Sequence, residues 1–271
     1  MKTVFLFLFT ISYHLLSGTV NAAGSDIMVV IDVTDSTSVN GTVIAEIKFK
    51  DKGFKTKCTY IDAINYLKEQ AKEHGANVIK ITQHKYPDSW SSCHRMEATL
   101  YHVEDAGALE KEITWTTGRL LAAADFKAER SPLPASGLGA VSDCGISFAS
   151  SAANAFAKVR FSVQAVFTTG RSWIHPEHVQ NKELLNHEQK HFDLCELYAR
   201  KLYKELQDAG LTAATMQQAN NIFKTVYNEY NERQYKYDTE TEHGTNLKEQ
   251  AKWDTIILEE LNSLSAYADH L

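Results

Sequence analysis

The chain has 271 residues, of which 44% are hydrophobic and 23% are charged, and its formal net charge at pH 7 is −6. This size and composition provide material for one large hydrophobic core or two modest ones, and we favour two. The acidic balance argues against nucleic acid or an anionic membrane surface as a partner.

Residues 1–22 have the three parts of a secretory signal peptide. Lys2 provides the positive charge, residues 4–16 form an apolar stretch, and Val20-Asn21-Ala22 is a small-residue cleavage site. The segment is too short to span a membrane, and no other segment approaches the roughly 18 to 20 apolar residues that a spanning helix needs. The sequence therefore predicts an exported protein, periplasmic or extracellular, with no membrane span.

Residues 24–105 are expected to form a small α+β domain in the order ββαββ. The predicted helix is amphipathic and ends at Gly75, and the predicted elements lie at 27–33, 43–49, 60–74, 77–83 and 96–103. A helix flanked by cysteines and followed by Gly75-Ala76-Asn77-Val78-Ile79 resembles small bacterial envelope domains of the stress-sensor type. This resemblance implies a fold and no activity. A polar link at 104–111 is the expected domain boundary.

Residues 112–271 are expected to form a second α+β domain with an antiparallel sheet and long helices. A loop at 131–139 precedes the strongest strand pair, 140–148 and 158–167. The second strand alternates apolar with polar residues, which is typical of an antiparallel sheet edge, and a peptide could add alongside it. Helical periodicity follows, with Asn181 as the first cap and a polar junction between the last two helices, at 181–208, 213–237 and 246–266.

Four cysteines in an exported chain favour disulfide bonds over thiolate metal ligands. Division of the chain into two domains favours the pairs Cys58–Cys93 and Cys144–Cys195. Cys195 is also four residues after His191, on the same helical face, and so remains open as a zinc ligand.

The motif His187-Glu188-Gln189-Lys190-His191 is the strongest functional signal. Imidazoles at positions i and i+4 of a helix lie on one face, one turn apart, where both can reach the same zinc ion. Glu188 lies about 100° around the helix from His187, beside the metal, and is the candidate general base. The other interpretation is an amphipathic helix with solvated or core histidines.

A catalytic zinc usually has three protein ligands and an open position. We expect the third ligand in the polar junction after residue 237, and we predict His243, next to Gly244. Asp238 is the first alternative, and Glu240 or Glu242 the next.

The two polar motifs, 187–193 and 237–244, occur with further aromatic and small residues, including Trp115, Asp125-Phe126, Cys144-Gly145, Phe167, Ser172-Trp173, Gln250 and Trp253. Together these residues resemble the bacterial family described as predicted secreted zinc-dependent proteases, over about 112–262. The resemblance implies a zincin-like architecture for this part of the chain.

The sequence thus predicts a secreted zinc metallopeptidase acting on a protein or peptide substrate. His187, His191 and His243 would hold Zn²⁺, and Glu188 would activate its bound water. Two alternatives remain open. One is a non-catalytic envelope binding protein with a structural zinc, which a fourth ligand such as Cys195 would favour. The other is a metal amidase acting on cell-wall crosslinks.

Overall fold

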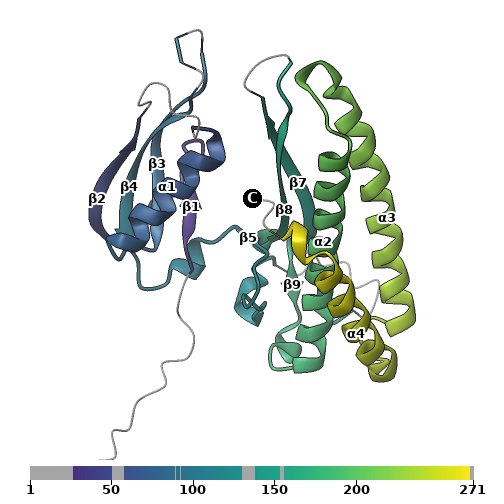
Figure 1. Cartoon of the computed structure of the whole chain (residues 1–271). Coiled ribbons are helices and arrows are strands. Elements are labelled where there is room, and N and C mark those ends of the chain that lie inside the picture. Colours follow the sequence, from purple (N-terminus) through teal and green to yellow (C-terminus); the bar gives the residue numbers. More distant parts are fainter. Residues whose placement is uncertain are drawn as a thin grey trace, which may run out of the picture.

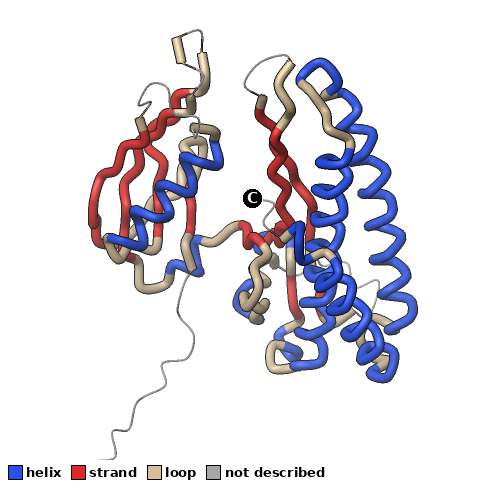
Figure 2. Tube along the Cα trace, in the orientation of Figure 1, coloured by secondary structure: helices blue, strands red, loops and turns tan. Residues whose placement is uncertain are grey.

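The computed structural model of the chain describes residues 27–50, 58–88, 90–91, 93–129, 138–152 and 156–268. The predicted signal peptide and most of the loop predicted at 131–139 lie outside these ranges. A sheet with one helix comes first along the chain, and two smaller sheets with three long helices follow (Figures 1 and 2). The α+β class predicted from the sequence is confirmed. No helix in the described ranges is both long enough and apolar enough to cross a membrane.

The first sheet contains four strands in the spatial order β1-β3-β4-β2. Strand β1 is parallel to β3, and the other neighbours are antiparallel. The elements follow the predicted order ββαββ: β1 (Val29–Ile31), β2 (Thr42–Phe49), α1 (Tyr60–Glu73), β3 (Val78–Lys85) and β4 (Arg95–His102).

Helix α1 covers one face of this sheet and begins with a capping box. The Thr59 hydroxyl accepts from the Asp62 amide, and the Asp62 carboxylate accepts from the Thr59 amide. The helix and the sheet share one core, which includes Ala63, Leu67, Ala71, Ile79, Ile81 and Leu100. The disulfide between Cys58 and Cys93, predicted from the sequence, joins the segment before α1 to the segment before β4.

The second sheet contains three strands in the order β5-β8-β7, and a two-stranded sheet pairs β6 with β9. These strands are β5 (Glu112–Thr114), β6 (Ala140–Val141), β7 (Cys144–Ser151), β8 (Arg160–Thr168) and β9 (Trp173–Ile174). The 158–167 strand was predicted to form a sheet edge, and this is wrong for its last residues, because β8 lies between β5 and β7 and β5 pairs with Val166, Phe167 and Thr168. Alternation reports which faces of a strand are covered and says nothing about its lateral neighbours.

Three long helices follow: α2 (Lys182–Asp208), α3 (Gln217–Thr241) and α4 (Leu247–Ser263). Helix α2 contacts β7 and β8 as well as α3 and α4. It begins at Asn181, whose side chain accepts from the Leu184 amide, and Gly210 with φ 55° follows its end. Nearly all residues of α2 between His187 and Arg200 are buried. The charged side chains among them therefore need partners inside the fold.

Helix α3 extends beyond its predicted end at residue 237. The hydroxyl of Thr241 donates to the carbonyl of Tyr237, and both side chains are fully buried. Only after Thr241 does the backbone turn left-handed, at Glu242 and His243. Asp238 therefore lies on the last turn of a helix, where the sequence predicted a polar junction.

Candidate metal centre

Helix α2 brings two imidazoles together, as the motif spacing predicts. The Nε2 atoms of His187 and His191 are 3.2 Å apart, and the ring centroids are 4.7 Å apart. The side chains are 2% and 14% exposed, so both rings lie inside the contact between α2 and α3.

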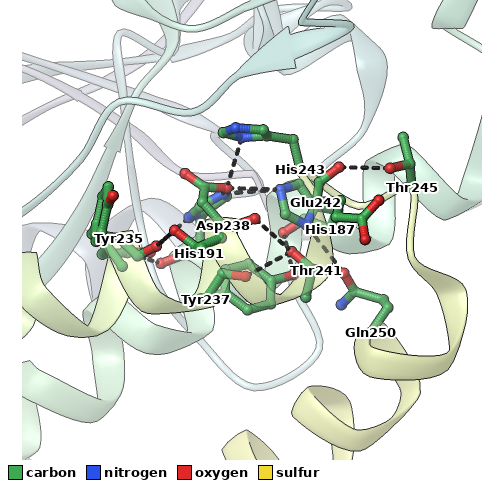
Figure 3. Close-up of polar contacts among 12 residues, drawn as sticks. His187, His191, Tyr235, Tyr237, Asp238, Thr241, Glu242, His243, Thr245 and Gln250 are labelled. Atoms are coloured by element: carbon green, nitrogen blue, oxygen red, sulfur yellow. Dashed lines mark hydrogen bonds and ion pairs between the residues drawn. The ribbon is translucent and has the colours of Figure 1, made fainter.

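Asp238 of α3 completes a group of three ligand atoms (Figure 3). Its Oδ1 atom lies 3.2 Å from Nε2 of His187 and 3.1 Å from Nε2 of His191. In the part of the chain that the structure describes, these three residues form the group whose ligand atoms all lie within 4.8 Å of one another.

A glutamine of α3 fixes the orientation of His191. The Nε2 amide of Gln234 donates to the backbone carbonyl of His191 over 2.9 Å, so its Oε1 faces Nδ1 of the same residue at 2.6 Å. An amide oxygen can only accept, and Nδ1 must therefore carry the ring proton. The neutral imidazole then presents an unprotonated Nε2 to the centre.

A second glutamine, on α4, does the same for His187. The Gln250 amide donates to Oδ1 of Asp254 over 2.7 Å, and its Oε1 lies 3.0 Å from Nδ1 of His187. The hydroxyl of Tyr237 also donates to this Oε1, and Asn186 donates to Asp254. Paired amides therefore set the same tautomer in both motif histidines.

Three lone pairs consequently converge on one place. Two unprotonated imidazole nitrogens and a carboxylate oxygen have no proton to share, so a cation must lie between them. It is either an added proton, which would make hydrogen bonds from the imidazoles to Asp238, or a metal ion. Atoms 3.1–3.2 Å apart can all lie about 2.0–2.2 Å from a single ion, which is the bond length of nitrogen and carboxylate ligands to zinc. The donor set fits a metal.

The pKa values at the centre shift in the direction that a cation site requires. Burial opposes the charged form of His191, but hydrogen bonding to Asp238 and the charge of Glu188 outweigh it and raise the pKa of His191. Burial also opposes the charged form of Asp238, yet the hydrogen bonds to His187 and His191 hold the pKa of this carboxyl well below its usual range. Both shifts favour positive charge between the side chains.

Glu188 is buried beside this group, with 3% of its surface exposed. Its Oε2 atom is buried and has no hydrogen-bond partner in the described structure. A buried carboxylate oxygen without a partner is costly, and such sites are often completed by water or an ion. This is the position that the sequence predicted for a general base.

His243, the predicted third ligand, lies next to the group of three and is not one of its members. Its Nδ1 is 3.3 Å from Oδ1 of Asp238, and its side chain is 57% exposed. Asp238, the first alternative from the sequence, is the third member of the group. Glu240 and Glu242 have other partners: Glu240 accepts from the Trp253 indole, and Glu242 accepts from the Asn246 amide.

Gly244 allows the chain to pass directly over His187. Its φ is +83°, and a Cβ atom there would lie 2.8 Å from Cγ of His187. This position requires glycine both for its backbone angle and for the space.

Cys195 is not a member of the ligand group, and its predicted bond to Cys144 is wrong, because both are free thiols. The Cys195 thiol is buried, interacts with Tyr230 and the backbone of Val166, and has a pKa raised to about 12 by burial. It belongs to the core between α2 and the sheet.

Sequence reasoning missed the glutamines that orient the two imidazoles. Gln234 and Gln250 are 43 and 63 residues away from their partners. Gln250 is part of the family resemblance, which gives it no role. Its helical position, one turn before Asp254 on the face with Trp253, was the available signal.

Neither the curated proteins nor the solved structures contain a match to this chain. Residues 153–244 match the model of a family described as "Bacterial protein of unknown function (DUF922)". The matched segment includes α2 and α3, and hence His187, Glu188, His191, Asp238 and His243. The segment that carries the candidate metal centre is therefore similar to this bacterial family.

Proposed function

We propose that this chain is an exported zinc-dependent metallopeptidase. The observation that carries the proposal is the convergence of three ligand atoms, from His187, His191 and Asp238, beside the unpartnered buried carboxylate oxygen of Glu188. The combination supplies a metal site and a base in one place.

In the proposed site, His187, His191 and Asp238 hold the ion, and Gln234 and Gln250 keep both imidazoles in the ligating tautomer. Zinc would act as a Lewis acid toward the scissile carbonyl and lower the pKa of an attacking water from 15.7 to about 7. Three protein ligands leave a position open for this chemistry.

Glu188 is the general base and then the general acid of the proposed reaction. Its Oε2 accepts the proton of the attacking water, and the same carboxyl then gives that proton to the amine of the departing peptide. Because Glu188 is buried, bulk water has little access to this oxygen. A protein or peptide substrate is proposed because the motif spacing is that of zinc peptidases.

Two measurements on the purified protein test the proposal. Elemental analysis is expected to find about one zinc per chain, and far less in the double variant His187→Ala, His191→Ala. Hydrolysis of fluorescein-labelled casein is expected to fall by at least about 10²-fold in Glu188→Gln, while zinc stays bound.

Glu183→Gln is the matched control, because Glu183 is an exposed residue in the first turn of the same helix. It is expected to keep full activity and full zinc. Activity that survives Glu188→Gln would refute the role of the base. Equal metal content in the wild type and the double variant would refute the metal site itself.

A further inference from the structure

His243 contacts a ligand of the proposed centre from the outside. Its Nδ1 lies 3.3 Å from Oδ1 of Asp238, the same oxygen atom that faces the two motif imidazoles. Figure 3 shows the His243 ring beside Asp238, joined to it by this contact. With 57% of its side chain exposed, His243 contributes little to the core.

His243 is the imidazole that can donate to Asp238. The Nδ1 protons of His187 and His191 are committed to Gln250 and Gln234, so their Nε2 atoms present lone pairs to the carboxylate. Nδ1 of His243 can carry a proton and donate it to Oδ1. A ligating carboxylate that accepts such a hydrogen bond is held in one orientation.

The backbone that places His243 is itself unusual. Glu242 and His243 have φ angles of 50° and 53°, a left-handed conformation that residues with a Cβ atom rarely adopt. Two backbone hydrogen bonds support the turn, from His243 N to Asp238 O and from Asn246 N to Thr241 O. Directly after them, Gly244 packs on His187. Strained backbone of this kind is concentrated at functional sites.

We propose that His243 is a positioning residue for Asp238, and that the left-handed turn at 242–244 serves to aim its Nδ1 at the ligating oxygen. The inference rests on the proposed function, since it concerns the same metal centre. It predicts that the Nδ1 position of residue 243 matters for metal affinity and that the Nε2 position does not.

Substitution of His243 by asparagine or by glutamine distinguishes the role of Nδ1 from that of Nε2. The side-chain amide of asparagine can place an N–H where Nδ1 of histidine lies, and asparagine tolerates a left-handed backbone. Glutamine can replace only the more distant Nε2. We therefore compare zinc affinity in the wild type, His243→Asn, His243→Gln and His243→Ala, by competition with a chromophoric chelator at pH 7.5.

His243→Ala and His243→Gln are expected to weaken zinc binding about 10- to 100-fold, and His243→Asn less than about 3-fold. The absorption spectrum of the cobalt-substituted protein is expected to be that of the wild type in His243→Asn and altered in His243→Ala. Thermal unfolding of the metal-free variants in chelator checks that all four proteins fold alike.

Wild-type affinity in all variants would overturn the inference while leaving the metal site intact. Loss of more than about 10³-fold in His243→Asn and His243→Ala alike would also overturn it, and would make His243 a metal ligand. A wild-type protein that binds no zinc would instead refute the proposed function, before any variant is compared.

Discussion

The Nδ1–H group of each motif histidine donates to a neutral side-chain amide. Metal-bound histidines commonly donate their second N–H to a carboxylate or a backbone carbonyl, whereas here the acceptors are Gln234 and Gln250. An amide fixes the tautomer without adding negative charge. Asp238 provides a carboxylate within the ligand group, Glu188 lies beside the group, and Asp254 lies behind Gln250.

Sequence reasoning succeeded at this scale where the geometry is local. The relation between His187 and His191 depends only on the helical repeat, and it is confirmed by the 3.2 Å separation of their Nε2 atoms. The glutamines could not be found in this way, because their contacts depend on how α3 and α4 pack on α2.

Gly244→Ala is expected to weaken zinc binding. The new Cβ would lie 2.8 Å from Cγ of His187, so the ring must move away from the centre. Gly210→Ala is the control, because Gly210 also has a positive φ, 55°, but no atom within 4 Å of a Cβ there. Each variant should lose about 1 kcal/mol of stability from backbone strain.

Isothermal titration with zinc separates the two effects of this substitution. Only Gly244→Ala is expected to lose affinity, by at least about 10-fold. Equal zinc affinity in both alanine variants would show that the His187 ring has room to move.

Among the elements, the end of α3 shows what periodicity cannot predict. Asp and Thr after residue 237 are weak helix formers, which favoured a junction there. The buried side chains of Tyr237 and Thr241 continue the helix for another turn. Tertiary packing thus moved Asp238 from a loop to a helix and made it the third member of the ligand group, in place of His243.

Helix α2 and strand β7 carry the two thiols. Cys195 has a pKa near 12 through burial, so at pH 8 only about one thiol in 10⁴ is ionised. Iodoacetamide is expected to modify Cys195 very slowly in the native protein, and faster as the pH rises toward 12. In denaturant without reductant, mass spectrometry should find modification at Cys144 and Cys195 and none at Cys58 or Cys93.

An unmodified denatured protein would contradict this expectation. It would mean that Cys144 and Cys195 are joined, as the division of the sequence into two domains first suggested.

The molecule as a whole contains separate hydrophobic cores. One lies between α1 and the first sheet, and another joins α2, α3 and α4 to the second sheet. Composition favoured two modest cores, and the described residues form three buried clusters, two of which lie on the first sheet. The pairing of β7 with β8 was predicted from the sequence and is confirmed, whereas the place of β5 beside β8 was beyond the sequence, since β5 is only three residues long.

The Cys58–Cys93 disulfide is expected to stabilise only the first of these units. It closes a loop with a sequence separation of 35, which corresponds to about 4 kcal/mol in the chain-entropy model. Calorimetry of the full chain should show two transitions, and the double variant Cys58→Ser, Cys93→Ser should lower just one of them. Zinc content should not change. A single transition that shifts as a whole would show that the two units unfold together.

Residues of three helices form the candidate metal centre. The candidate ligands lie on α2 and α3, and Gln250, which orients His187, lies on α4. An ion bound there is a crosslink between segments far apart in the chain, made after folding and reversible. By mass action, free zinc at about 1,000 times the dissociation constant would add about 4 kcal/mol to the stability of the native state. Under the proposed function, metal supply would then govern how long the chain survives proteolysis, as well as whether it is active.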